Sequence, residues 1–246
     1  MTIIDLSGYI EPNHEIEITY YDHQQGAEQI SNFFNVPSTL LKYGEGWAVE
    51  EFTRFPTHSS THIDAPWHYN SRIDGRPAPT VDELPLEWFF SDGVVLEMRH
   101  KETGNPVTVQ DIKGELDRIN YEIKPLDIVL IRNGQDEYFT QPDYMTKGCG
   151  VTAEATRWLY NNGVRVMGID AWGWDAPLHL QARKALEKNE PGIFWEAHQA
   201  GIAYSQIERL KNLASLPPYG FKIACFPLKI KNGSGAPARV VAILPD

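Results

Sequence analysis

The sequence predicts an α/β fold, in which a mixed sheet packs against helices within a single domain. Two observations carry this prediction: short apolar, β-branched runs recur along the chain, and patterns that start helices lie between several of them. Gly and Pro are spread over all 246 residues without a long flexible linker or an internal repeat. We therefore expect one domain over residues 1–246.

The strand-like runs are short stretches rich in valine, isoleucine and leucine. They cover residues 94–98, 127–132, 164–169, 221–226 and 239–244. Three further stretches begin with a serine or threonine at a position typical of a helix start. In chain order these are Thr108 with Asp111, Thr152 with Gly163 closing the stretch behind it, and Ser205 with Glu208.

The net charge and the composition of the N-terminal segment argue against several classes of partner. Lys and Arg number 22 against 33 Asp and Glu, a formal net charge of −11, and no basic run is long enough to follow a phosphate backbone. The N-terminus lacks the basic and apolar segments of a targeting signal, and no stretch approaches the ~18 apolar residues of a membrane span. We expect a cytoplasmic protein that binds neither nucleic acid nor membrane.

Histidine is concentrated in one short segment. Three of the eight histidines, His58, His62 and His68, fall within eleven positions, and Asp64 lies among them. A lone histidine is usually a surface residue or a hydrogen-bonded core residue, but this concentration around a carboxylate predicts a metal site. The two cysteines have no C-x-x-C spacing, so we expect nitrogen and oxygen ligands.

The prolines at positions 56 and 66 disfavour a continuous helix, so we expect this segment to be extended. Side chains of a strand alternate, which puts His58, Ser60, His62 and Asp64 on one face. Two imidazoles and one carboxylate suit Zn²⁺ or Mn²⁺ and leave positions open for water and substrate. A water molecule bound to such a metal has a pKa of about 7, so hydroxide becomes available as a nucleophile at neutral pH.

His68 lies beyond the bend expected at Ala65 and Pro66. If the chain turns there, the imidazole of His68 faces the activated water. It would then act as a general base toward that water and as a general acid toward the leaving group.

Residues 58–68, with the sequence H-S-S-T-H-I-D-A-P-W-H, resemble the signature H-x-G-T-H-x-D-x-P-x-H of the metal-dependent cyclase-like hydrolases. This is the family of kynurenine formamidase and isatin hydrolase. Further similarity runs along most of the chain, at residues 5–7, 125–132, 164–170, 208–213 and 226–228. Residues 168–175 and 195–198 are more similar to isatin hydrolase relatives than to kynurenine formamidases. The resemblance implies a cyclase-like, kynurenine formamidase-type fold and a hydrolase that acts on C–N bonds.

The resemblance also implies roles for single residues. His58, His62 and Asp64 match metal ligands, and His68 matches the histidine that moves protons. In relatives a downstream histidine and an acidic or amide side chain also approach the metal. The corresponding candidates in this chain are His198, Gln206 and Glu208. Glu208 has an alternative role as a helix cap with Ser205. The interval from His198 to Glu208 is shorter than expected for formamidase-like members, which favours a single metal.

The sequence departs from the family pattern at two places. Ser60 stands where the signature has glycine, so this position is expected to be regular strand. Ala224 and Cys225 stand where isatin hydrolase relatives tend to carry a serine, so a proton relay through that serine does not transfer to this chain.

Tryptophans beside the metal-binding segment predict an aromatic pocket, because flat rings stack on such walls at low entropic cost. The tryptophans beside or between the inferred site residues are Trp67, Trp172, Trp174 and Trp195, and the first three are the candidates for substrate contact. A small aromatic or cyclic amide, lactam or lactone would fit, and Arg54 or Arg132 could bind a product carboxylate. Two other functions stay open: a lyase or cyclase that uses the same metal without net hydrolysis, and a non-catalytic, metal-stabilised binding protein. The resemblance implies a homo-oligomer.

Overall fold

The structure is a computed structural model, and it describes residues 1–245. The chain divides into two compact units. We call residues 1–9 together with the chain from Ser60 onward the sheet unit, and residues 10–59 the hairpin unit. Within the described chain, no helix is long and apolar enough to cross a membrane. The extent of the single domain predicted for residues 1–246 stays a prediction.

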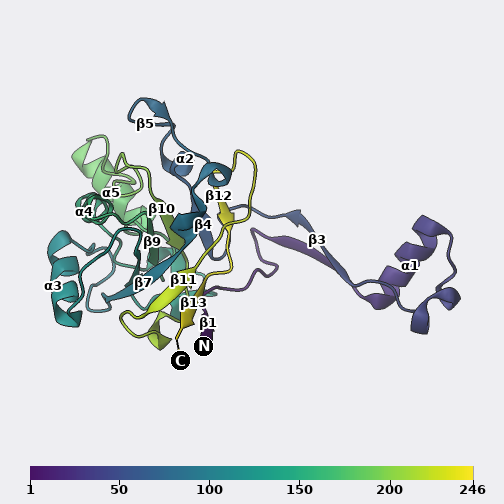
Figure 1. The fold of residues 1–246 in the computed structure, drawn as a ribbon. Helices are drawn as coiled ribbons and strands as arrows, with labels where there is room; N and C mark the ends of the chain where they lie inside the picture. Colours follow the sequence, from purple (N-terminus) through teal and green to yellow (C-terminus); the bar gives the residue numbers. More distant parts are fainter. Residues whose placement is uncertain (246) are drawn as a thin grey trace. The chain divides into compact units, whose positions relative to one another are not determined.

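The sheet unit is built on a mixed sheet, which confirms the predicted fold class (Figure 1). Among the described residues the sheet has nine strands, in the order β1-β13-β11-β7-β8-β9-β10-β4-β12. The strands are β1 (Thr2–Asp5), β4 (His62–Asp64), β7 (Phe90–Glu97), β8 (Ile128–Arg132), β9 (Val166–Ile169), β10 (Ser205–Glu208), β11 (Phe221–Ala224), β12 (Gly235–Pro237) and β13 (Val241–Leu244). The four neighbouring strands β7 to β10 pair in parallel, and the other pairings are antiparallel. All five strand-like runs of the sequence therefore lie in this sheet.

The sheet separates two hydrophobic cores, because successive side chains of a strand point to opposite faces. In β7, Val94 and Leu96 belong to one core and Val95 belongs to the other. The first core also holds residues of two helices, α3 (Val109–Ile119) and α4 (Ala153–Asn161). A third helix, α5 (Leu178–Lys188), lies on the same side of the sheet in Figure 1.

Two of the three predicted helix starts are confirmed. The side chain of Thr108 accepts a hydrogen bond from the Asp111 amide at the start of α3, and Thr152 accepts one from Ala155 at the start of α4. The third prediction is wrong, since residues 205–208 form β10, a fully buried strand between β9 and β4. Pairing on both edges satisfies its backbone, and this outweighs the local cap pattern.

Short elements complete the sheet unit. The four-residue helix α2 (Pro66–Tyr69) follows β4, and β5 (Arg72–Ile73) pairs with β6 (Arg76–Pro77) in a small hairpin. The 3₁₀ helices of this unit are η3 (Val81–Glu83), η4 (Leu86–Phe89), η5 (Asp136–Tyr138), η6 (Tyr144–Thr146) and η7 (Leu213–Ser215). Both cysteines are free and buried.

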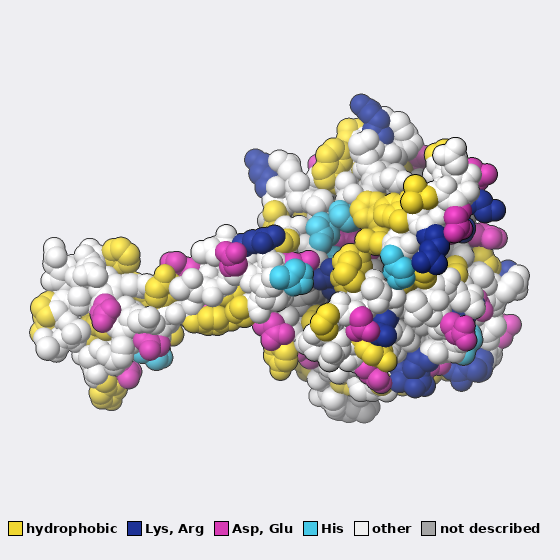
Figure 2. Space-filling model, turned by 180° about the vertical axis from the view of Figure 1, so that it is seen from behind, with side chains coloured by type: hydrophobic (Ala, Val, Ile, Leu, Met, Phe, Trp, Pro, Cys, Tyr) yellow, Lys and Arg dark blue, Asp and Glu magenta, His cyan; other side chains and the backbone are white. Residues whose placement is uncertain are grey.

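The hairpin unit has a small core. Its strands β2 (Glu17–Tyr21) and β3 (Val49–Arg54) are antiparallel, and its helical segments are α1 (His23–Phe34), η1 (Ser38–Leu40) and η2 (Lys42–Gly44). Gly26 in α1 allows a close backbone approach, since a Cβ there would lie 1.8 Å from the carbonyl oxygen of Trp47. Several large apolar side chains are exposed, among them Phe33 at 71% and Tyr43 at 82%. Figure 2 shows hydrophobic side chains, in yellow, at the surface of the protein.

Asp170 joins the ends of two central strands. It follows β9, and its two carboxylate oxygens accept hydrogen bonds from the amides of Asn133 (2.7 Å) and Gly134 (2.8 Å), just after β8. Burial raises the pKa of Asp170 from its ordinary value of 3.8 to about 7, although the two hydrogen bonds favour the ionised form.

We expect the stabilisation contributed by Asp170 to fall as the pH rises. The folded carboxyl keeps its proton to about pH 7, whereas the unfolded chain releases it near 3.8. The free energy of unfolding therefore decreases through this window by about 1.4 kcal/mol per pH unit, or ~3 kcal/mol between about pH 5 and about pH 7. Urea unfolding of the wild type and of Asp170→Asn across this pH range measures how the free energy of unfolding depends on pH. The stability difference between the two proteins should shrink with rising pH, and a constant difference would contradict the assignment.

Candidate metal centre

The site is built on β4 and its antiparallel neighbour β10. The register places Gln206 opposite Asp64 and Glu208 opposite His62. Directly opposite residues point to the same face, and so do alternate residues of one strand, so these four side chains share a face. All four residues are buried, and the exposed fraction of Glu208, the largest of them, is 5%.

The segment before β4 is less regular than predicted. The alternation expected over residues 58–64 holds only for His62 and Asp64, since β4 begins at His62. Ser60 has a φ of 55°, so the expectation of regular strand at this position is wrong. Its hydroxyl donates to the carbonyl of Tyr9 (2.8 Å), and its own carbonyl is 2.9 Å from Nδ1 of His62. Ser60 thus has the left-handed conformation that a glycine adopts most easily.

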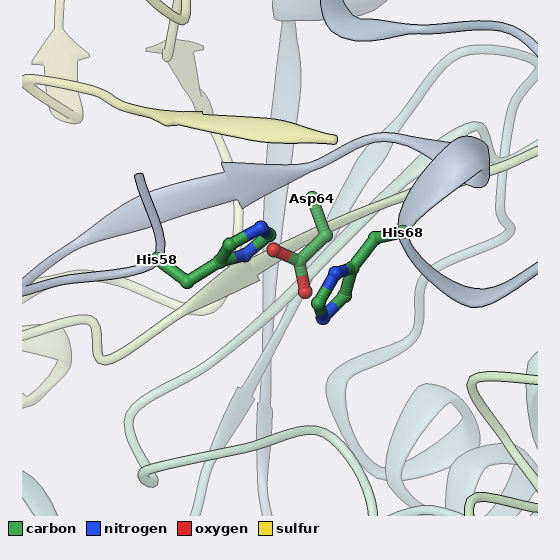
Figure 3. Close-up of side chains that lie close together, drawn as sticks. All are labelled: His58, Asp64 and His68. Atoms are coloured by element: carbon green, nitrogen blue, oxygen red, sulfur yellow. The ribbon is translucent and has the colours of Figure 1, made fainter. Parts of the chain in front are cut away.

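One group of possible ligands contains His58, Asp64 and His68, which all come from the eleven-residue segment. A ligand atom of each lies within 4.8 Å of the others. Figure 3 shows the carboxylate of Asp64 between the two imidazole rings. His68 lies in α2, whose first residue is Pro66, so the predicted turn at this proline is confirmed. We call these three residues the outer group.

A second group contains His62, Asp64 and Glu208, again with a ligand atom of each within 4.8 Å of the others. Nε2 of His62 is 3.2 Å from Oδ1 of Asp64 and 3.6 Å from Oε2 of Glu208. Nε2 of His198 is 3.5 Å from Oε1 of Glu208 and 3.9 Å from Oδ2 of Asp64. We call these four residues the inner group. Asp64 belongs to both groups, so the geometry offers room for two adjacent cations as well as for the single metal that the sequence favours.

The secondary structure at Glu208 excludes one of the two roles predicted for this residue. It lies in a strand, so the predicted alternative of a helix cap is wrong. Its Oε1 accepts a hydrogen bond from the amide of Trp174 (2.8 Å), which fixes the carboxylate toward the two histidines of the inner group. The next residue, Arg209, has a φ of 61° and is held there by Thr61, whose hydroxyl donates to its carbonyl (2.7 Å).

The electrostatics of the inner group favour bound positive charge. Burial by itself lowers the pKa of His62, but Asp64 and Glu208 outweigh it and raise that pKa. Burial also acts to lower the pKa of His198, and Asp175 and Glu208 raise it to about 10. Each imidazole is therefore stabilised as a cation by buried carboxylates, and a divalent metal would take the place of these protons.

The amide of Gln206 provides a test of whether a metal fits. Its nitrogen donates to the hydroxyl of Tyr204, and among the described residues its Oε1 has no hydrogen-bond partner although it is fully buried. A buried acceptor without a donor is costly unless another partner satisfies it. Because Gln206 is opposite Asp64 in the register, a cation held by the nearby carboxylates would satisfy this oxygen, and the residues present fit a divalent metal with nitrogen and oxygen ligands.

The predicted tryptophans lie in different surroundings. Trp67, in α2, is 43% exposed, and Trp172 lies under the guanidinium of Arg209, with Cζ 4.8 Å from the ring centroid. Trp174 is fully buried, and its indole N–H donates to Thr156, so its ring belongs to the core rather than to a surface that a substrate can contact. On the face drawn in Figure 2, histidine side chains border a hydrophobic patch.

Two further residues contact the site, and the sequence gives no role to the second of them, Asp175. The ring of Trp195 stacks on His198 at 4.7 Å with an interplanar angle of 6°, and it meets the ring of His68 at 5.2 Å. Asp175 is buried against His198. Asp175 lies in residues 168–175 and Trp195 in residues 195–198, the two stretches that resemble isatin hydrolase relatives, and this resemblance is the sequence signal for both residues. Arg132 is paired with Glu97 (2.8 Å), so it is not available for a product carboxylate.

Known proteins are similar to this chain in sequence. The family model described as "Putative cyclase" matches residues 4–176. Kynurenine formamidase of Erythrobacter litoralis is 28% identical over 194 residues, which cover 77% of this chain and 75% of the relative. Isatin hydrolase of Roseibium aggregatum is 23% identical over 256 residues, 99% of this chain and 92% of the relative.

Solved structures agree with the fold. Isatin hydrolase A from Labrenzia aggregata, bound to benzyl benzoate, superposes with a TM-score of 0.75 at 23% identity and covers 100% of this chain and 94% of its own. An isatin hydrolase bound to the product analogue thioisatinate has a TM-score of 0.69 at 21% identity, with 99% and 92% covered. These similarities confirm the predicted family resemblance and the cyclase-like fold.

Proposed function

The chain belongs to the cyclase family, and from this premise we propose that it is a metal-dependent hydrolase that cleaves the C–N bond of an amide or a lactam. Lactones are included as substrates because their carbonyl undergoes the same attack. The observation that carries the proposal is the position of Asp64, a buried carboxylate that belongs to both groups of possible ligands. Its ligand atom lies within 4.8 Å of those of His58 and His68 in the outer group, and of those of His62 and Glu208 in the inner group.

The proposed ligand roles are those predicted from the sequence, with His58 in the outer group, His62 in the inner group and Asp64 in both. His58, His62 and Asp64 are the proposed principal metal ligands, with His198, Gln206 and Glu208 as further ligands. A divalent metal at this site, Mn²⁺ or Zn²⁺, would polarise a carbonyl oxygen and lower the pKa of a water molecule.

The proposed work of the protein is proton transfer and orientation. The imidazole of His68 accepts a proton from the attacking water and later returns it to the leaving nitrogen. Trp195 contacts the rings of both His68 and His198, so it restricts where the His68 imidazole points. The separation of roles depends on His68 remaining outside the ligand set, although its distance to Asp64 also allows coordination.

A small aromatic or cyclic substrate is the proposed class. Aromatic ligands occupy two of the similar isatin hydrolase structures, benzyl benzoate in one and thioisatinate in the other. In this chain Trp67 and Trp172 are the accessible candidates for a contact with a flat ring. Among residues 1–245 no acidic side chain pairs with Arg209, which lies beside Glu208 and over Trp172, so its guanidinium is the proposed contact for a carboxylate product.

We propose a homo-oligomer in the cytoplasm. The buried residues of the hairpin unit are Ile16, Gly26, Ala27 and Ser59. This is a small core for residues 10–59. Burial of the exposed aromatic side chains against a second copy of the chain would stabilise an oligomer. Light scattering at several protein concentrations tests this, with a stable monomer as the contrary result. The two free cysteines support a reducing compartment.

The test of the proposed function is elemental analysis of the purified protein combined with a panel of aryl amides, lactams and lactones. We expect bound Mn or Zn, turnover of at least one panel member, loss of turnover on chelation and its return with added metal. A protein without metal, or one that turns over a substrate equally well after chelation, would refute the proposal. One similar structure is described as a potential metal-dependent hydrolase with cyclase activity, so ring closure or elimination without water is the second function to assay.

A further inference from the structure

Asp175 is a buried carboxylate that binds both the backbone and the side chain of one histidine. Its Oδ2 is 2.5 Å from Nδ1 of His198 and accepts the amide of the same residue at 3.0 Å. Its Oδ1 accepts the amide of Ala197 at 3.0 Å. Both the backbone and the ring of His198 are therefore bound to one side chain, 23 residues earlier in the chain.

We propose that Asp175 is the positioning residue that turns His198 into a metal ligand of the inner group. A carboxylate at Nδ1 keeps a hydrogen on that nitrogen, and this leaves the lone pair of Nε2 for a metal. Nε2 is the atom that points to Glu208 (3.5 Å) and Asp64 (3.9 Å). The inference rests on the metal centre of the proposed function but on no particular substrate.

Other contacts hold the ring in the same orientation. The ring of Trp195 covers one face of the His198 imidazole, and Tyr69 meets it edge-on at 5.7 Å. Gln181 holds the backbone of Trp195 in place. Its side-chain oxygen accepts a hydrogen bond from the Trp195 amide (2.6 Å), and its side-chain nitrogen donates to the carbonyl of Ala176. A ring confined in this way loses little entropy when it binds a metal, provided that Asp175 selects the correct tautomer.

A cavity beside Asp175 makes a chemical test practicable. It has a volume of about 100 Å³, and Asp175 lines it together with Gln181, Lys184 and Glu196. A formate ion is small enough to enter a space of this size. In an Asp175→Ala protein, formate could therefore replace the missing carboxylate next to Nδ1 of His198.

The experiment measures the affinity of the full-length protein for Mn²⁺ and Zn²⁺ by competition with a chelator. We expect Asp175→Asn to weaken binding by about 10- to 100-fold, as is common for a carboxylate behind a ligating histidine. Asp175→Ala should be equally weak and should recover on addition of formate but not of formamide. Asp175→Asn should add no further loss in a His198→Gln background, because the two residues act as one unit.

The matched control is Asp127→Asn. Asp127 is also buried and accepts hydrogen bonds from the hydroxyl of Tyr121 and the amide of Lys124, both at 2.8 Å, but it precedes β8 and does not touch the site. We expect this variant to lose stability and to keep its metal affinity. Full affinity in folded Asp175→Asn, or additive losses in the double variant, would overturn the inference.

A measurement on the wild type keeps the inference testable if the variants do not fold. In ¹⁵N NMR spectra of the zinc-loaded protein, His198 should show a protonated Nδ1 and a metal-bound Nε2. A protonated Nε2, or a ring unaffected by zinc, would overturn the proposal. Failure of the proposed function is distinguishable, because a protein that hydrolyses no amide or lactam can still show the expected affinities and spectrum.

Discussion

The Asp64→Ala protein is expected to lose its metal and at least about 1,000-fold of its hydrolytic activity. Asp64 is the only residue common to the two ligand groups found among residues 1–245, so its removal affects every arrangement of one or two cations that the site allows. Metal analysis after dialysis and initial rates with the best panel substrate measure both effects.

The matched variant is Asp64→Asn, which keeps one oxygen at the same place but removes the charge. It should bind metal more weakly than wild type and more tightly than Asp64→Ala. Thermal unfolding checks that both variants fold, since a buried carboxylate surrounded by histidines also contributes to stability. A folded Asp64→Ala protein with full metal content and wild-type rates would exclude the proposed centre.

His68→Ala is expected to lower turnover by about 100- to 10,000-fold while the bound metal is retained. A ligand atom of the imidazole lies within 4.8 Å of one of Asp64, so His68 could also be a metal ligand. The variant therefore distinguishes a general base from a ligand. Removal of a general base leaves the metal content unchanged, whereas removal of a metal ligand lowers it. Turnover and metal content of the same preparation give the answer.

His100→Ala is the control for this prediction, because His100 is exposed and distant in sequence from the segment 58–68. It should behave as wild type in both measurements. If His68→Ala loses its metal in parallel with its activity, His68 is a ligand and the proton must be moved by another group. If it retains full activity, the assignment of a general base fails.

Local sequence signals were sufficient for most of the fold. Valine-rich and isoleucine-rich runs became strands because both faces of the sheet are covered by core, and Thr108 and Thr152 start helices where the sequence places them. The Ser205 to Glu208 stretch failed because its fate depends on its neighbours. A strand paired on both sides gains more from the sheet than from a cap.

The site was predictable where it is contiguous in sequence. Residues 58–68 bring their own carboxylate and imidazoles, but the left-handed Ser60 shows that spacing alone does not give the path of the backbone. The inner group is different, because Glu208 reaches His62 only through the pairing of β10 with β4. The bond between Asp175 and His198 joins two loops, and no local pattern indicates such a contact.

The central claim is that this chain uses a metal and water to cleave a carbonyl bond, and hydrolysis in ¹⁸O-labelled water tests it most directly. The metal-loaded protein should place one ¹⁸O atom in the product carboxylate for each bond cleaved, and the chelated protein should form no product. A product that forms without the label would assign the site to a lyase or cyclase reaction instead, and labelled product from the metal-free protein would contradict the role of the metal.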